Sequence, residues 1–191
     1  KMQLPSEELK AELMFSNETF DKLTDMCAKP DSFPPAYYEH EVIKAADHEE
    51  RKSIVPYAIF SDGAPFEARR IGSDSIFVIS ACNMITSKRH ICLILRYSDM
   101  CQCGCKGWCT LFPILCAFRQ DLECLTLGQH NAARSDNLKW QPTDRVRSTW
   151  AGKPLGFRGM LMYKKCDLGE LATRLGIPSP ADPVSYTHLT L

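Results

Sequence analysis

Two acidic residues, each placed directly after an apolar run, are the positions best suited to chemistry. Asp62 follows the run VPYAIFS, and Asp167 follows FRGMLMYKKC. A carboxylate at the end of a buried strand is costly unless something pairs with it. Two carboxylates held close together repel each other, and divalent cations relieve that repulsion. Each residue also has an ordinary structural interpretation, because Asp-Gly is a common hairpin signal and Asp167 alone fits a helix N-cap.

A second group of chemically capable residues lies in the segment CQCGCKGWC, which holds Cys101, Cys103, Cys105 and Cys109. Four thiolates can bind one Zn²⁺ tetrahedrally, and the two glycines of the segment permit a tight loop. The spacing lacks the usual two CxxC pairs separated by a longer loop. A redox-labile cluster, or cysteines that pack as small hydrophobes, therefore remain alternatives to zinc. We expect the cluster to form a loop.

Composition limits the class of protein. The chain has 191 residues, of which 45% are hydrophobic. It contains no run of 18 apolar residues, so we expect no membrane span, and no leader that would indicate secretion. Ten cysteines without a leader argue against a disulfide scaffold and indicate reduced thiols, a metal site or small buried hydrophobes, which fits an intracellular protein. Five of them, expected in the core, are Cys82, Cys92, Cys116, Cys124 and Cys166.

Charge is unevenly distributed along the chain. Residues 1–53 hold 7 Lys and Arg against 12 Asp and Glu, whereas residues 54–191 hold 16 against 11. A mildly basic body is compatible with nucleic-acid binding, although a solvated surface explains the same balance.

Hydrophobic periodicity predicts the elements that position these residues. Residues 1–35 read as one or two short helices and a Pro-rich linker, forming an appendage that packs loosely on the main domain or separately from it. We expect the main domain over residues 36–180 and a disordered tail over 181–191. Apolar runs predict strands at 55–60, 76–82, 91–97 and 157–165. Residues 110–128 form an amphipathic helix whose apolar positions are Leu111, Leu115, Phe118, Leu122 and Leu125.

This order of elements is that of the ribonuclease H-like fold. We therefore predict an α/β protein with a mixed sheet, made of a three-stranded antiparallel meander and a fourth strand parallel to the first. Helices flank the sheet. In this arrangement Asp62 and Asp167 meet on one rim, with their carboxyl groups within about 8 Å of each other in an open cleft.

The motifs VPYAIFSDGAPF, DSIFVIS, ICLILRY and FRGMLMYKKCD together resemble the core of CACTA-type (En/Spm-like) transposases. The chain also resembles a group of uncharacterised Cys-rich algal proteins that share DGxxF and CxCxCxxWC. These resemblances cover roughly residues 37–180. The segment after Asp167 is Leu-Gly-Glu, not Phe-Pro-Ala, so it departs from the transposase pattern. Glu170 is interpreted as a surface residue.

The transposase resemblance implies nuclear, Mg²⁺-dependent DNA cleavage and strand transfer by two-metal phosphoryl transfer. Asp62 would bridge two Mg²⁺ ions and Asp167 would bind one. Phosphate contacts would come from Arg69, Arg70, Lys88, Arg89, Lys164 and Lys165. No residue of this chain matches the third acid of the family, so we expect a fragment inactive by itself.

Two other interpretations remain open. One is a non-enzymatic module of the same fold that binds nucleic acid or protein through its basic face and Cys-rich knuckle. The other is a structural zinc domain without catalytic ancestry. The last eight residues, VSYTHLTL, resemble a translated sequencing adapter, and we expect them not to be native.

Overall fold

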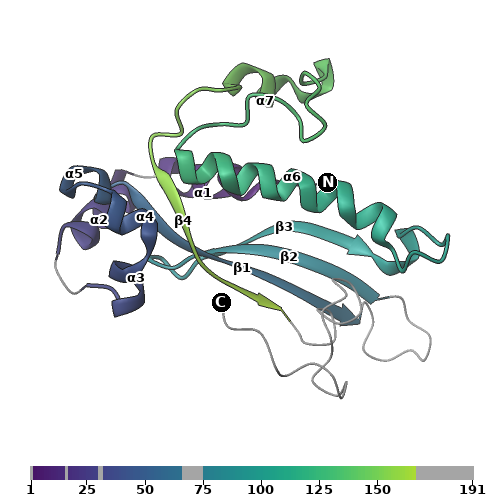
Figure 1. Ribbon diagram of the computed structural model, residues 1–191, viewed down its shortest axis with the longest axis horizontal. Coiled ribbons are helices and arrows are strands. Elements are labelled where there is room, and N and C mark those ends of the chain that lie inside the picture. Colours follow the sequence, from purple (N-terminus) through teal and green to yellow (C-terminus); the bar gives the residue numbers. More distant parts are fainter. Residues whose placement is uncertain (1, 16, 30–31, 66–74, 167–191) are drawn as a thin grey trace.

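The computed structural model describes residues 2–15, 17–29, 32–65 and 75–166. Its centre is a four-stranded sheet in the order β3-β2-β1-β4 (Figure 1). The strands are β1 (Ile54–Pro65), β2 (Ser75–Asn83), β3 (Arg89–Arg96) and β4 (Arg158–Cys166). The pairs β1–β2 and β2–β3 are antiparallel, and β1–β4 is parallel. The predicted α/β class is confirmed, as is a mixed sheet whose fourth strand lies beside the first.

Seven helices of the described residues accompany the sheet. They are α1 (Pro5–Phe15), α2 (Asn17–Ala28), α3 (Pro35–Glu39), α4 (Glu41–Ala45), α5 (His48–Arg51), α6 (Trp108–Leu127) and α7 (Arg145–Trp150). Two 3-10 turns, η1 (Tyr97–Asp99) and η2 (Pro142–Asp144), precede α6 and α7. None of the helices in these ranges is long and apolar enough to cross a membrane.

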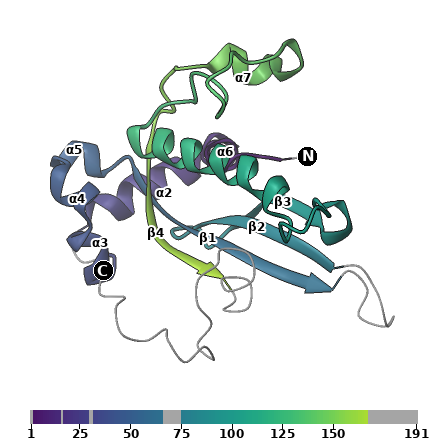
Figure 2. The same cartoon turned by 45° about the vertical axis from the view of Figure 1, so that its right-hand side comes forward.

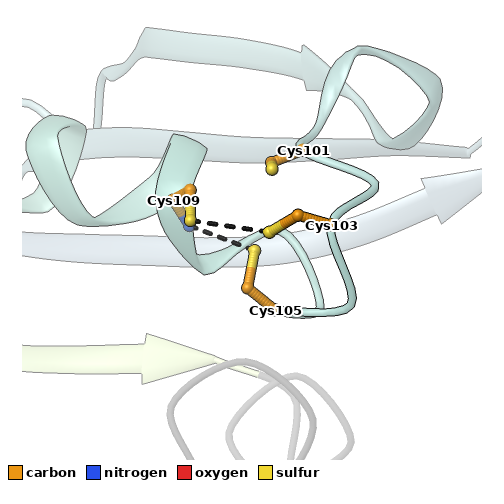
Figure 3. A group of neighbouring side chains, drawn as sticks. All are labelled: Cys101, Cys103, Cys105 and Cys109. Carbon is orange, nitrogen blue, oxygen red and sulfur yellow. Dashed lines mark hydrogen bonds between the residues drawn. The ribbon is translucent and has the colours of Figure 1, made fainter.

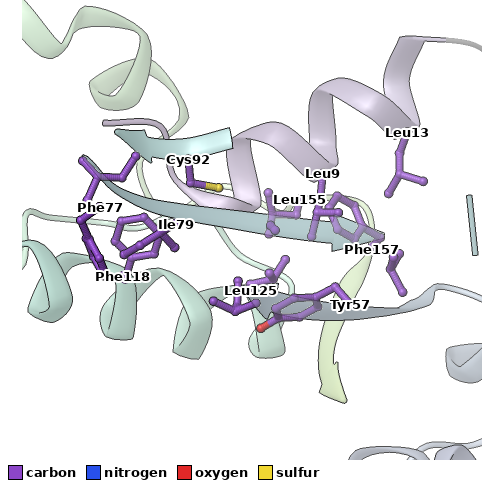
Figure 4. Packing of buried hydrophobic residues seen from close by; sticks show 14 of the residues in the cluster. Leu9, Leu13, Tyr57, Phe77, Ile79, Cys92, Phe118, Leu125, Leu155 and Phe157 are labelled. Carbon is purple, nitrogen blue, oxygen red and sulfur yellow. The ribbon is translucent and has the colours of Figure 1, made fainter. Parts of the chain in front are cut away.

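One face of the sheet is covered by α6 and α1 (Figures 1 and 2). The predicted apolar stripe of α6 faces the sheet, since Leu111, Phe118 and Leu125 are all buried. They join the alternate β1 residues Tyr57 and Ile59 in the main hydrophobic cluster (Figure 4). The apolar residues that alternate along β1 and those that recur every three or four residues along α6 therefore pack in one core, as the sequence pattern predicted.

Helix α6 and strand β4 make an unusually close contact at Gly159. A Cβ added to Gly159 would lie 2.4 Å from Leu125 Cγ, closer than carbon atoms approach in proteins. Leu125 itself is fully buried. Glycine at this position therefore lets α6 lie directly on β4 and holds β4 against the rest of the sheet.

The helix α1 belongs to the core, contrary to the expected loose packing of the N-terminal region. Leu9 and Leu13 are buried in the main cluster, and His90 of β3 contacts Glu12 of α1 at 2.7 Å. Asp121 of α6 accepts hydrogen bonds from the backbone N–H and the hydroxyl of Ser6. It therefore satisfies a free N–H at the start of α1. A domain boundary near residue 35 stays a prediction.

The opposite face of the sheet carries a second, smaller cluster. Ile54 of β1 and Met160 of β4 pack there against Tyr37 and Ile43, from α3 and α4. Figure 2 shows these short helices gathered at the end of the sheet where β1 begins.

Candidate functional site

The four cysteines of the CxCxCxxWC segment converge on one point (Figure 3). The Sγ atoms of Cys101, Cys103, Cys105 and Cys109 all lie within 4.8 Å of one another. Those of Cys103 and Cys109 are 3.8 Å apart. Four sulfurs about 2.3 Å from a tetrahedral Zn²⁺ would be separated by about 3.8 Å. The cluster is therefore within about 1 Å of the geometry required to close around a metal ion.

The backbone explains why the sulfurs meet. Cys101, Cys103 and Cys105 lie in the loop that joins η1, after β3, to α6, as predicted. The prediction is wrong for Cys109, which lies in the first turn of α6 because the helix begins at Trp108. Gly104, Lys106 and Gly107 have positive φ angles of 88°, 54° and 83°, which fold the loop tightly. The N–H of Cys101 donates to Thr110 Oγ1 at 2.9 Å, which fastens the start of the loop to the first turn of α6.

Hydrogen bonding makes the thiols of the cluster unequal. The backbone N–H of Cys109 donates to Cys105 Sγ at 3.4 Å and lowers the pKa of the Cys105 thiol to about 6. The neighbouring thiols of Cys105 and Cys103 raise the pKa of Cys109 to about 12. Hydrogen bonding therefore favours the thiolate form of Cys105, beside the N-terminus of α6, where the helix dipole also favours negative charge.

The donor set decides which metals fit this cluster. Four thiolates suit Zn²⁺ and other soft or borderline ions, whereas Mg²⁺ prefers oxygen ligands. The four residues could therefore hold a metal such as zinc, and they do not suit Mg²⁺. All four are free thiols in this structure, as are Cys82, Cys92, Cys116 and Cys124. Cys92 is buried as expected, the other three of that group are half-buried, and the side chain of Cys166 lies outside the described residues.

Asp62 lies in a different setting from the one expected. It does not end its strand, and it is not in a hairpin turn. β1 continues to Pro65, with Asp62 paired to Val78 and Gly63 to Phe77 of β2. The antiparallel partner extends this far, so ladder hydrogen bonds outweigh the local Asp-Gly turn signal. The Asp62 side chain is exposed.

The register of the parallel pair β1–β4 places Asp62 relative to the second acid. Ser61 pairs with Cys166, the last described residue of β4, and Asp62 and Asp167 are the next residues of the two strands in sequence. A bulge produces this alignment: Tyr57 pairs with Leu161 but Ala58 with Tyr163. Without that extra residue, Asp62 would be aligned with Cys166. Asp167 itself lies outside the described residues, so the predicted distance between the two carboxyl groups is not tested.

The six basic residues expected at phosphates divide into three groups. Arg69 and Arg70 lie outside the described residues. Lys88 and Arg89 are exposed at the start of β3, and Lys164 and Lys165 are exposed near the end of β4. Arg89 and Lys165 share a face of the sheet with Phe60, because Arg89 lies over the Phe60 ring and Lys165 pairs with Phe60. Lys164 pairs with Ile59 and so belongs to the opposite face.

Sequence reasoning missed Asp121, which is 1% exposed. Burial raises the pKa of Asp121 to about 6, although the hydrogen bonds from Ser6 oppose the shift. The signal was available, because residue 121 falls on the same stripe of α6 as Phe118 and Leu125. Sequence reasoning also missed the contact between Phe60 and Tyr163, which depends on the β1–β4 register and on the bulge.

Comparison with protein-family models, with curated proteins and with solved structures gave no match for this chain. The relation to transposases therefore stays a prediction from the sequence motifs.

Proposed function

We propose that this chain is a ribonuclease H-like fragment of a transposase-derived nuclear protein, whose ancestral activity is metal-dependent cleavage and transfer of DNA strands and which is inactive as this fragment. Asp62 and Asp167 would hold the divalent metal ions, and the cysteine cluster would hold structural zinc. The observation that supports this best is the parallel β1–β4 register, which pairs Ser61 with Cys166, the residues directly before the two acids in the sequence. The strand order β3-β2-β1-β4 is also the order expected for this fold.

Asp62, near the end of β1, is suited to bind a divalent metal ion. Asp62 presents an exposed carboxylate, and oxygen ligands are those that Mg²⁺ prefers. When bound, Mg²⁺ would activate the attacking oxygen and stabilise the leaving one. The proposal requires the β1–β4 register to continue for one more residue, so that Asp167 lies about 4.8 Å from Asp62 along the direction of strand pairing.

The cysteine cluster lies at the same end of the sheet as Asp62. β3 runs parallel to β1, since both are antiparallel to β2, and the loop follows the end of β3. A closed Cys₄ site is structural, because it leaves no open coordination position for chemistry. Its role would be to fix the connection between β3 and α6 beside the metal-binding rim.

A second candidate function is a non-enzymatic module that binds nucleic acid or protein through the same fold. The convergence of the four sulfurs favours this binding module, because a metal held by these cysteines could stabilise the fold. That structural role does not require the two acids Asp62 and Asp167.

Mn²⁺ binding, measured by electron paramagnetic resonance on the zinc-loaded chain, distinguishes these candidates. We expect Mn²⁺ to bind, and both Asp62→Asn and Asp167→Asn to weaken binding at least tenfold, because each removes a charged ligand. Asp136→Asn, a change at an exposed acid, is the matched control and should bind as the original chain does. Unchanged Mn²⁺ binding in both site variants would leave the non-enzymatic module as the better account.

A further inference from the structure

The two faces of the sheet differ in how they are covered. Helices α1 and α6 cover the face that carries Tyr57 and Ile59 (Figures 1 and 2). The other face is covered at Ile54 and Met160 by α3 and α4. Beyond that point it carries partly exposed side chains within the described part of the chain. We call this part the open face and define it by Phe60, Tyr163, Arg89, Lys165, Ile91 and Ile94.

Two aromatic rings, from β1 and the edge strand β4, lie side by side on the open face. The centroids of Phe60 and Tyr163 are 6.0 Å apart, with an interplanar angle of 81°. Tyr163, on the edge strand β4, is 45% exposed. The bulge in β4 produces this pair, because it brings Tyr163 opposite Ala58, one row from Phe60 on the same face.

Two cations flank these rings. The guanidinium carbon of Arg89 lies 4.2 Å from the centroid of the Phe60 ring, in a cation–π contact. Lys165 is exposed and pairs with Phe60 in the β1–β4 register. Along β1, the next residue on this face after Phe60 is Asp62. The open face therefore combines apolar rings with positive charge and leads directly to the proposed metal-binding carboxylate.

The aromatic rings and cations of the open face suit some classes of partner better than others. An apolar helix or a second sheet packed here would bury Arg89 and Lys165 without partners, which is costly. Ile91 and Ile94, 53% and 52% exposed, add apolar area on β3, the strand that carries Arg89. Unpaired bases offer flat rings that stack on aromatic and guanidinium groups, and the phosphates of the same strand match the cations. In a duplex the bases are already stacked inside, so the rings of this face could not reach them.

We propose that the open face binds single-stranded nucleic acid. Bases stack on Tyr163 and on the Arg89–Phe60 pair, and Lys165 contacts phosphate. The bound nucleic-acid strand then runs along this face past Asp62. The inference rests on the proposed function for the class of ligand, but binding requires neither Mg²⁺ nor Asp167.

Fluorescence anisotropy tests the proposal on the whole zinc-loaded chain without added Mg²⁺ or Mn²⁺, using a fluorescein-labelled oligo(dT) of about 15 nucleotides, close to the upper end of known site sizes. We expect Tyr163→Leu to weaken binding by about five- to a hundredfold, which corresponds to the loss of one base–aromatic stack. Tyr163→Phe keeps the ring and should bind within about twofold of the original chain. Lys165→Ala removes the proposed phosphate contact and should reduce the slope of log K against log salt by about 0.7.

Matched controls lie on α6, on the covered side of the sheet. Phe112, 53% exposed, and Arg119, whose side chain is 82% exposed, offer an aromatic and a cationic control. Phe112→Leu and Arg119→Ala should leave binding unchanged, and thermal melting would verify that every variant is folded. Equal weakening by Phe112→Leu and Tyr163→Leu would overturn the proposal, as would a hairpin duplex that competes as well as the single strand.

Failure of this proposal can be told apart from failure of the proposed function. Asp62→Asn removes a negative charge beside the path of the nucleic acid, so it should bind oligo(dT) at least as tightly as the original chain while it weakens Mn²⁺ binding. Loss of oligo(dT) binding only in Asp62→Asn would overturn the stacking surface and leave the metal site standing.

Discussion

Replacement of Gly159 by alanine is expected to destabilise the protein through one identifiable contact. The new Cβ would lie 2.4, 2.8 and 2.9 Å from Leu125 Cγ, Cδ2 and Cδ1. Carbon atoms in favourable contact are about 3.5–4.0 Å apart, so helix and strand must separate by about 1 Å or more. Overpacking of a core costs about 1–3 kcal/mol and occasionally more, and this site belongs at the upper end because Leu125 is fully buried.

A double-mutant cycle isolates that contact. We expect Gly159→Ala to lower the free energy of unfolding by about 3 kcal/mol, and the Tm by about 6–12 °C for a chain of this size. Leu125→Ala alone should cost about 2–5 kcal/mol through the cavity that it leaves. In the double variant the added methyl group enters that cavity, so its cost should be smaller than the sum by about 1–3 kcal/mol.

Urea unfolding followed by circular dichroism measures all three variants. Leu127→Ala, on the same helix but 67% exposed, is the control and should change stability by less than about 0.5 kcal/mol. Strictly additive costs for Gly159→Ala and Leu125→Ala would refute the reasoning. In that case α6 would not lie directly on β4, and the placement of β4 beside β1 would lose its support.

Two further outcomes are expected from the cysteine cluster and from Asp121. Zinc buffered at about a thousand times its dissociation constant should stabilise the chain by about 4 kcal/mol and raise the Tm by about 8–16 °C. Cys105→Ser should abolish this gain and Cys116→Ser should keep it, while less than about half an equivalent of zinc in the purified protein would contradict a zinc site. For Asp121, a raised folded-state pKa means that its contribution to stability is complete below about pH 4 and is lost as the pH rises through about 6. The stability of the original chain relative to Asp121→Asn should therefore fall by about 3 kcal/mol between pH 4 and pH 7 in urea unfolding, and a flat or rising difference would contradict the raised pKa.

The order of the strands was predictable from the sequence because each strand is a separate apolar run between polar connections. Two of the predicted runs, 55–60 and 76–82, lie inside β1 and β2. The other two, 91–97 and 157–165, extend beyond β3 and β4 by one residue. The long helix was equally clear, since its apolar residues recur at the helical period over 20 residues. Periodicity of this kind reports which side chains are buried, and burial decided these elements.

Features that depend on partners far away in sequence were not predictable in the same way. The Asp-Gly pair at residues 62 and 63 reads as a turn locally, yet β2 extends β1 through it. The bulge that aligns Ser61 with Cys166 exists only in the pairing of two strands that lie a hundred residues apart in sequence. The packing of α1 was underestimated because its core contacts and its cap, Asp121, are both remote in sequence.

The candidate site was predictable in residue types but not in geometry. The four cysteines were identifiable from their spacing, but their convergence depends on the positive φ angles at Gly104, Lys106 and Gly107. Asp62 was identifiable as an acid at a strand, whereas its place on the open face beside Phe60 follows from the sheet register.

The most direct test of the proposed function is the anomalous scattering of Mn²⁺ in crystals of the zinc-loaded chain. The account predicts a Mn²⁺ peak in contact with the carboxylates of both Asp62 and Asp167, which would lie within about 8 Å of each other. Carboxyl groups more than about 12 Å apart, with no Mn²⁺ between them, would contradict it.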